Sequence, residues 1–173
     1  MTEEMVILVN ENDQELGLME KLEAHQKGVL HRAFSVLVFN KEGQMLLQQR
    51  AFNKYHSGGL WTNTCCSHPR QGENTMEAAH RRLMEEMGFD CDLTLHQTFV
   101  YKAPFDNGLT EHELDHVFVG EYNFDPAFNP EEVNQFQWIS MDELYLQLKE
   151  NPEHYTVWFR MIMDNYVHLG KKV

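Results

Sequence analysis

Cysteine is scarce in this chain of 173 residues, and the few cysteines are badly spaced for disulfides. There are three, and two of them, Cys65 and Cys66, are adjacent. Adjacent residues rarely reach the geometry of a disulfide, and Cys91 would then have no partner. The sequence therefore argues against a disulfide-stabilised secreted fold and favours free thiols in a reducing compartment.

Basic residues are also few. Lysine and arginine total 14, against 27 acidic residues, which gives a formal net charge of −13. Nucleic acids and anionic membranes both require a surplus of basic side chains on some face of a protein. We therefore expect neither as a partner, and an anionic ligand has to meet a local cluster of lysine and arginine.

Long apolar runs are missing as well. Residues 1–10 contain a short apolar run with no basic region before it, and no later stretch approaches the length of a membrane span. The expectation is a cytoplasmic protein with no membrane partner. There is no internal repeat, linker or low-complexity stretch, and 42% of the residues are hydrophobic. We therefore expect residues 1–173 to form a single compact domain.

Strand and helix patterns are interspersed along the chain. Apolar and β-branched runs predict strands, and apolar residues at helical intervals predict helices. The expected strands cover residues 6–9, 32–39, 44–49, 99–102, 111–122 and 135–139, and the expected helices cover residues 75–87, residues 155–169 and a segment that Ser140 and Glu143 cap and that ends before Pro152. This mixture predicts an α/β (α+β) fold with a mixed β-sheet packed between helices.

Local signals mark where several of these elements begin and end. Residues 40–43 form a four-residue loop with a glycine available for a positive φ, which predicts a hairpin between the strands on either side. Asn74 precedes Glu77 at the spacing of a capping box, and Gly88 supplies a C-terminal stop. The helix of residues 75–87 is therefore well delimited.

Histidines and carboxylates from separate stretches suggest one metal site. His25 and His31 lie near the N-terminus, His68 follows the paired thiols, and Glu111 and Glu113 come much later. Imidazoles and carboxylates suit a borderline or hard divalent cation. In an extended segment, Glu111 and Glu113 project from the same face and can bind one cation together.

Simpler interpretations remain open. With Asp115, the two glutamates can form the solvated face of an edge strand, and a lone histidine usually lies at the surface or at the edge of a core. Residues 61–69 are harder to explain as packing, because they contain an indole, small polar residues, two thiols and His68. We expect this segment to be a functional loop.

Residues 81–89 resemble part of the Nudix motif. That motif runs from a glycine through a glutamate to R-E-hydrophobic-x-E-E-x-G-hydrophobic, and the matching positions are Glu73, Arg81, Leu83, Glu85, Glu86, Gly88 and Phe89. Ser67 replaces the opening glycine, and Arg82 stands where the hydrolases have a metal-binding glutamate. The carboxylate cluster that attacks a phosphoanhydride is therefore incomplete. An ordinary surface helix with i,i+4 ion pairs is the alternative.

Together, these motifs resemble the type I isopentenyl diphosphate isomerases, a family with the Nudix fold. The resemblance spans roughly residues 5 to 165. It is carried by residues 20–25, 30–35, 49–54 and 60–69, by the altered Nudix helix, and by Tyr101 with residues 111–113. It implies one Nudix-like domain, and the family's own altered motif accounts for the two departures from the hydrolase pattern.

The resemblance also implies a role for each site residue. The implied ligands of one zinc, manganese or magnesium ion are His25, His31, His68, Glu111 and Glu113. The implied catalytic groups are Cys66, which accepts a proton, Glu113 with Tyr101 on the opposite side of the substrate, and Trp158 near the hydrocarbon. The implied diphosphate contacts are Lys21, Arg50, Lys54 and Arg82, with Glu86 holding a Mg²⁺ ion that arrives with the diphosphate. Position alone leaves Trp158 equally explicable as a core residue of the final helix, and no role is implied for Cys65.

The implied activity is the interconversion of isopentenyl and dimethylallyl diphosphate in isoprenoid biosynthesis. The alkene gains a proton, and the resulting tertiary carbocation loses a different one. The alternatives are a Nudix hydrolase of a nucleoside diphosphate derivative, against which Arg82 argues, and a noncatalytic metal-binding or isoprenoid-binding module, which has no use for the thiol. A monomer is expected, because no coiled-coil pattern or long apolar edge is visible.

Overall fold

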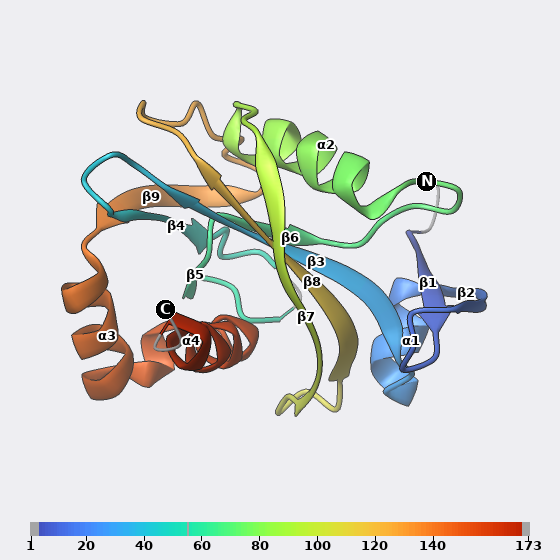
Figure 1. Ribbon diagram of the computed structural model, residues 1–173. Coiled ribbons are helices and arrows are strands. Elements are labelled where there is room, and N and C mark those ends of the chain that lie inside the picture. The colour runs from blue at the N-terminus through green and yellow to red at the C-terminus, as the bar shows by residue number, and fades with distance from the viewer. Residues whose placement is uncertain (1–3, 55, 171–173) are drawn as a thin grey trace.

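The computed structural model describes residues 4–54 and 56–170. Its strands are β1 (Met5–Val9), β2 (Glu15–Glu20), β3 (His31–Phe39), β4 (Met45–Arg50), β5 (Trp61–Thr62), β6 (Cys65–Ser67), β7 (Leu93–Pro104), β8 (Thr110–Glu121) and β9 (Val133–Ile139). Its helices are α1 (Lys21–Lys27), α2 (Thr75–Met87), α3 (Met141–Glu150) and α4 (Val157–Gly170), with a 3₁₀ turn, η1 (Pro152–His154). All of these strands join one mixed sheet, with α2 over one face and α3 and α4 over the other (Figure 1). The predicted mixed sheet between helices is confirmed.

Strand β3 lies at the centre of the sheet. It runs parallel to β8, from His31 opposite Glu113 to Phe39 opposite Glu121, and antiparallel to β6. Strand β7 pairs with the other edge of β8. Strand β8 is therefore an interior strand, and the interpretation of its carboxylates as the face of an edge strand is wrong.

The predicted hairpin around residues 40–43 is confirmed only at its tip. Strands β3 and β4 pair at Phe39 and Met45, and Gly43 has the expected positive φ of 78°. Beyond this pair the strands diverge, since β3 joins β8 and β6 while β4 pairs with β9. A turn dictates only the local reversal, whereas the longer pairings depend on strands far away in the sequence.

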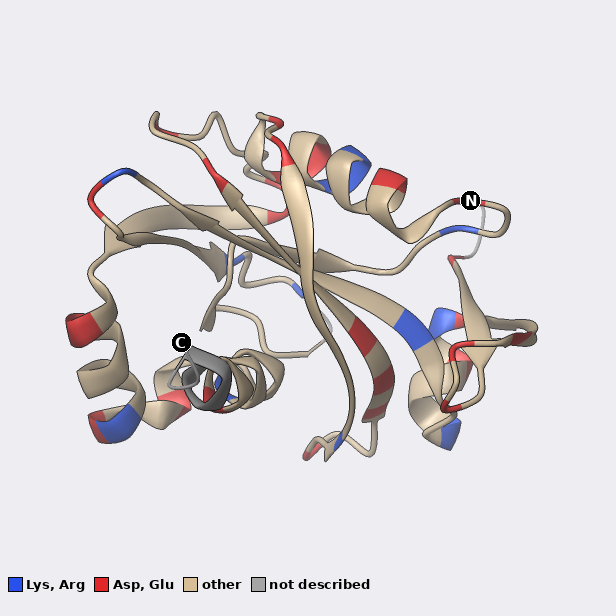
Figure 2. Cartoon of the chain, in the orientation of Figure 1, with Lys and Arg blue, Asp and Glu red and all other residues tan. Residues whose placement is uncertain are grey.

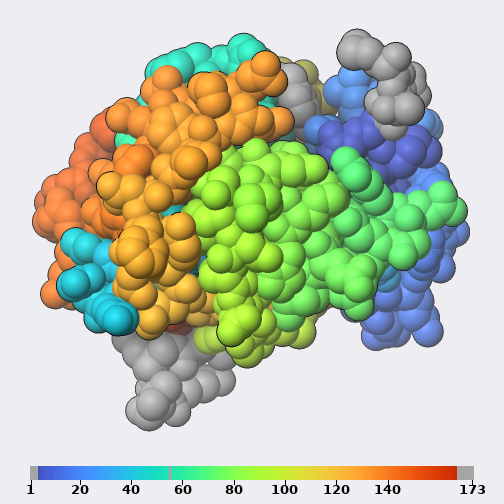
Figure 3. Space-filling model, turned by 90° about the horizontal axis from the view of Figure 1, so that it is seen from above, coloured from blue at the N-terminus to red at the C-terminus, as the bar shows by residue number. Residues whose placement is uncertain are grey.

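Alternate residues of the central strand face the two helical layers. Val36 and Val38 belong to the hydrophobic cluster under α2, whereas Leu37 belongs to the cluster under α4. Burying a side chain such as Leu83 of α2 contributes about 1.5–3 kcal/mol. Viewed from above, α2 lies between the segment that leads to β9 and the N-terminal hairpin (Figure 3).

Helix α2 has the predicted bounds and cap residues, although the N-cap hydrogen bond comes from Met76 and not from Glu77 as in a capping box. The side chain of Asn74 accepts a hydrogen bond from the backbone N–H of Met76, and Gly88 ends the helix with a φ of 71°. A Cβ atom on Gly88 would lie 2.1 Å from the carbonyl oxygen of Ala127. Glycine is therefore needed at this position both for the left-handed backbone and for the close approach of another segment.

Other boundaries differ from the expectations. Residues 61–69 were expected to be a loop, which is wrong, because they contain β5 and β6. Helix α3 has the predicted cap at Ser140, whereas α4 begins at Val157, since Tyr155 forms an isolated bridge with Trp61. Strand β2 and helix α1 were not expected from the sequence. Both are short, and short elements depend on tertiary packing more than on periodicity.

Within the described ranges, no helix combines the length and the apolar character that crossing a membrane requires. The expected domain of residues 1–173 includes residues 1–3, 55 and 171–173, which lie outside the described residues.

Candidate active site

A cavity of about 690 Å³ brings the predicted site residues together. Of these residues, all except His31 line it, and His31 is fully buried. The predicted residues in the lining are Lys21, His25, Arg50, Lys54, Cys66, His68, Arg82, Glu86, Tyr101, Glu111, Glu113 and Trp158. A volume of this size suits a small-molecule ligand.

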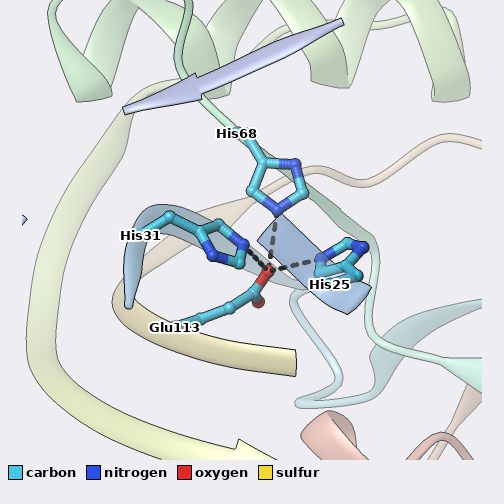
Figure 4. Close-up of side chains that lie close together, drawn as sticks. All are labelled: His25, His31, His68 and Glu113. Carbon is cyan, nitrogen blue, oxygen red and sulfur yellow. Dashed lines mark hydrogen bonds and ion pairs between the residues drawn. The ribbon is translucent and has the colours of Figure 1, made fainter. Parts of the chain in front are cut away.

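Three imidazoles converge on Glu113 (Figure 4). Its Oε2 atom lies 2.7 Å from Nε2 of His68, 2.9 Å from Nε2 of His31 and 3.9 Å from Nε2 of His25. The four side chains come from α1, β3, β8 and the segment after β6. The parallel register of β3 and β8 sets His31 directly beside Glu113.

The four donor atoms fit a divalent metal ion. They all lie within 4.8 Å of one another. Ligand bonds of about 2.0–2.2 Å place donor atoms at most about 4.4 Å apart, so a slight inward movement of the side chains brings the four atoms to bonding distance of one ion. Three imidazoles and one carboxylate also suit zinc or manganese chemically. These residues can therefore hold a metal ion.

The surroundings of Glu113 shift its pKa and those of the neighbouring histidines. Burial tends to raise the pKa of Glu113, but its contacts with His68, His31 and His25 outweigh burial and hold the pKa well below its usual range. Burial tends to lower the pKa of His31, but its contact with Glu113 raises it. Burial lowers the pKa of His68. Glu113 is therefore an ionised carboxylate in a buried setting.

Glu111 lies beside this group and not within it. The hydroxyl of Tyr101 donates to Glu111 at 3.0 Å and also to Glu113 through a very short contact. Burial and the neighbouring charge of Glu113 raise the pKa of Glu111 well above its usual range. Figure 2 shows the acidic bands on the lower part of β8, where Glu111, Glu113 and Asp115 are all buried.

The adjacent thiols point to opposite faces of the sheet. Cys66 pairs with Ser35 and lines the cavity, whereas Cys65 pairs with Val36 and is fully buried under α2. Successive residues of a strand alternate in this way. Burial raises the pKa of the Cys66 thiol, and the charge of Arg50 opposes this shift only in part. Cys66 is therefore a protonated thiol in the free protein.

Three of the cationic side chains of the cavity are held by carboxylates. Lys21 lies 2.7 Å from Glu4, and Lys54 forms a short ion pair with Glu132. Arg82 contacts three acidic residues, at 2.9 Å for Glu85, 3.3 Å for Glu86 and 3.6 Å for Glu132. The i,i+4 pairs expected for a surface helix are therefore present, but Glu86 is buried and faces the cavity.

Trp158 belongs both to the core and to the cavity wall. It is 2% exposed within the cluster under α4, and the guanidinium carbon of Arg50 lies 5.1 Å from the centre of its ring. The ring of His56 meets it edge-on at 5.7 Å. The two interpretations that the sequence left open are thus compatible.

Two further residues lie near the catalytic candidates, although neither of them was expected from the sequence to have a site role. His56 lies 3.5 Å from Glu111, and burial together with the charge of Arg50 lowers its pKa to about 3. Asp115 accepts a hydrogen bond from Ser35, and burial raises its pKa to about 8. No spacing marks His56, whereas Asp115 continues the i, i+2 series of Glu111 and Glu113.

Comparisons with known proteins agree on a family and a fold. The NUDIX domain model matches residues 29–160. "Isopentenyl-diphosphate Delta-isomerase" of Pectobacterium atrosepticum is 55% identical, over 90% of this chain and 87% of the relative. "Isopentenyl-diphosphate Delta-isomerase 2" of Aromatoleum aromaticum is 48% identical, over 95% of this chain and 87% of the relative.

Solved structures with low sequence identity share the fold. The Deinococcus radiodurans protein DR0079 superposes with a TM-score of 0.78 at 19% identity, covering 94% of this chain and 98% of that one. A MutT protein from Methanosarcina mazei gives a TM-score of 0.68 at 18% identity, covering 82% and 96%. The sequence relatives and the NUDIX match together establish that this chain belongs to the isopentenyl-diphosphate Delta-isomerase family, with a Nudix fold.

Proposed function

We propose that this enzyme interconverts isopentenyl and dimethylallyl diphosphate through the cavity described above. The family membership supports the reaction. The observation that carries it in the structure is that a thiol, a tyrosine-carboxylate pair, a metal-binding group and a cationic cluster line one cavity. A hydrolase does not need the thiol, and Arg82 replaces one of the carboxylates that its chemistry uses.

The reaction requires an acid and a base on opposite sides of the substrate. An unactivated alkene accepts a proton at its terminal carbon and becomes a tertiary carbocation. The cation then loses a proton from the carbon beside the one that bears the diphosphate ester oxygen. The two protein groups exchange roles in the reverse reaction.

Tyr101 and Glu113 are the proposed group on one side, and Cys66 is the proposed group on the other. The Tyr101 hydroxyl is protonated, because burial and the charges of Glu111 and Glu113 raise its pKa. Its short hydrogen bond to Glu113 offers a path for proton exchange. A divalent ion in the group of three histidines and Glu113, for which we propose zinc, manganese or magnesium, would supply Lewis acidity beside this path. Cys66 keeps its proton in the free protein, so it is the acid and the Glu113 carboxylate is the base when dimethylallyl diphosphate is converted back. In the forward reaction the proton starts on the Tyr101–Glu113 side, and Cys66 accepts the other proton as a thiolate.

The carbocation needs a neighbour that stabilises it without bonding to it. Trp158 presents an aromatic ring at the cavity wall, and a cation over such a ring in a desolvated site gains about 2 kcal/mol. Water must also be excluded, because it would trap the cation as an alcohol. The ring of His56 lines the cavity beside Trp158 and stacks on Phe105 at 4.8 Å, which adds apolar surface at this end of the cavity.

The diphosphate is the proposed partner of the cationic side chains. Lys21, Arg50, Lys54 and Arg82 line the cavity, and a multivalent anion in a protein of net charge −13 needs such a cluster. Glu86 reaches the same cavity and is the proposed ligand of a Mg²⁺ ion that accompanies the diphosphate. Glu111 is proposed to complete the ligands of the histidine site.

Three further properties belong to the same proposal. The whole sequence of residues 1–173 acts as one domain, since all described strands join one sheet. The enzyme is a cytoplasmic monomer, which agrees with its free cysteines. It contributes to isoprenoid biosynthesis by supplying the allylic isomer.

Proton NMR in heavy water tests the reaction directly. Isopentenyl diphosphate is incubated with the purified protein, Mg²⁺ and Mn²⁺. The expected result is dimethylallyl diphosphate with deuterium in its methyl groups and no release of phosphate. A phosphate or nucleoside monophosphate product from nucleoside diphosphate derivatives, with isopentenyl diphosphate left intact, would establish the hydrolase instead.

A further inference from the structure

Cys65 is a buried thiol that the proposed reaction leaves without a role. It is fully buried, and strand alternation turns it away from Ser35 and the catalytic candidates on the other face of the sheet. Its Sγ atom lies 3.0 Å from Oε2 of Glu86, to which the thiol donates a hydrogen bond.

Glu86 is a buried carboxylate held by a small set of donors. It is 6% exposed, and its Oε2 atom also faces the guanidinium of Arg82 at 3.3 Å. The side-chain amide of Gln48 approaches the other oxygen at 3.5 Å. The thiol therefore makes the shortest of these three contacts. A buried carboxylate needs such donors, because each missing hydrogen bond leaves charge unsolvated.

We infer that Cys65 is a positioning residue, whose thiol orients the Glu86 carboxylate for the cation that accompanies the diphosphate. This inference rests on the proposed function only through the role of Glu86. Groups that hydrogen-bond a metal ligand fix its direction, and their loss typically weakens metal binding by about 10- to 100-fold. The adjacent cysteines thus serve two ends of one cavity, with Cys66 at the reacting carbons and Cys65 behind the cation site.

The competing explanation is that Cys65 only fills space. It packs in the cluster that contains Ala79 and Leu83 of α2, and a buried cysteine often behaves as a small hydrophobic residue. Packing and positioning make different predictions for two substitutions. Cys65→Val fills the volume without a donor, whereas Cys65→Ser keeps a donor with a smaller atom.

The test measures binding of the second ion without turnover. The histidine site is first loaded with Zn²⁺, and Mn²⁺ is then titrated in the presence of inorganic diphosphate, with the free ion followed by electron paramagnetic resonance. We expect Cys65→Val to weaken Mn²⁺ binding about 10-fold or more, while Cys65→Ser stays within about 3-fold of the parent. Cys91→Ala is the matched thiol control and should bind like the parent. Equal Mn²⁺ affinity in Cys65→Val and the parent would overturn the inference.

An infrared measurement keeps the inference testable even if Cys65→Val fails to fold. The S–H stretching band of Cys65 is identified as the band lost in Cys65→Ser. Glu86→Gln replaces the charged acceptor and should move this band to higher frequency, whereas Glu85→Gln, one residue away on the same helix, should leave it in place. A band that does not respond to Glu86→Gln would show that the thiol does not donate to Glu86.

The failure of this inference is distinct from a failure of the proposed function. If the parent protein forms no dimethylallyl diphosphate, the proposed reaction is wrong, whatever the Mn²⁺ titrations give. If the parent is active and its second-ion affinity does not depend on the Cys65 donor, only the positioning role is wrong.

Discussion

Nε2 of His31 lies 2.9 Å from Oε2 of Glu113, although 82 positions separate the two residues in the chain. The parallel pairing of β3 with β8 creates this contact, because it sets the first residue of β3 beside Glu113. The same carboxylate oxygen lies within reach of His25 and His68. Glu113 is therefore the shared partner of three imidazoles and of Tyr101, which links metal binding to the proposed proton transfer.

Replacing Glu113 should disable metal binding. Glu113→Gln removes the charged donor and leaves three imidazoles around a neutral amide. Losing even an outer partner of a metal ligand costs about 10- to 100-fold in affinity, so we expect a loss of more than about 100-fold for Zn²⁺. Isothermal titration calorimetry measures the Zn²⁺ affinity of the parent and the variant. The control is Glu121→Gln, at the exposed end of the same strand. Unchanged Zn²⁺ affinity in Glu113→Gln would place the ion elsewhere.

Metal binding should weaken as the pH falls, beginning above the usual range of histidine. Glu113 raises the pKa of His31, and a protonated imidazole cannot bind a metal. Above the raised pKa of His31, the metal ion does not compete with a proton on this imidazole. Below that pKa the ion must displace a proton, so the metal affinity falls with the pH. Calorimetry in buffers of different ionisation enthalpy counts the protons released. Release of no proton near about pH 6 would contradict the expectation.

Removing the catalytic thiol should abolish most of the isomerase activity but not metal binding. Cys66→Ala deletes one of the two proposed proton-transfer groups, and such a group contributes about 10²- to 10⁴-fold to a rate. Cys66 is not one of the four clustered donors, so Zn²⁺ affinity should be unchanged. The rate is followed by NMR with isopentenyl diphosphate. Full activity in Cys66→Ala would refute the mechanism, while Cys91→Ala should remain active.

Activity should depend on how strongly the side chain at position 158 attracts a cation. Losing a cation–π contact of about 2 kcal/mol corresponds to about a 30-fold slower reaction, so kcat should fall from Trp158 to Trp158→Phe to Trp158→Leu. The Trp158→Phe substitution removes no hydrogen bond, because the indole Nε1 of Trp158 has no partner among the described residues. Thermal unfolding checks that the variants are folded, and Trp138→Phe serves as a control outside this cavity. Equal kcat values for the phenylalanine and leucine variants would rule out a role for the ring.

Asp115 should make the metal-free protein less stable as the pH rises. Burial raises its pKa to about 8 in the folded state, so its contribution is fully present below the ordinary value of 3.8 and is lost as the pH rises through about 8. Asp115→Asn should remove this dependence. A difference of 1 kcal/mol corresponds to about 2–4 °C in Tm for a protein of this size. Parallel Tm curves for the parent, Asp115→Asn and the exposed-loop control Asp106→Asn would contradict the expectation.

The sequence by itself predicted the class of fold and most of the site. The caps at Asn74 and Ser140 are local, because each depends on hydrogen bonds within three residues, and they delimit α2 and α3 as expected. The alternation of β8 places Glu111 and Glu113 on one face without any knowledge of neighbouring strands. The resemblance to the isomerases was carried by short motifs, and the site residues that it implied all line one cavity, apart from the fully buried His31.

Only the tertiary structure decided which residues meet. Local patterns cannot reveal that β8 is an interior strand, that the hairpin strands diverge, or that His56 approaches Glu111, because these depend on pairings between segments far apart in the chain. The two adjacent thiols show this dependence on tertiary structure most clearly. The sequence sets them side by side, but the pleat of β6 turns Cys66 toward the cavity and Cys65 toward Glu86. Their different surroundings arise because a strand sends successive side chains to opposite faces, and only folding determines what each face meets.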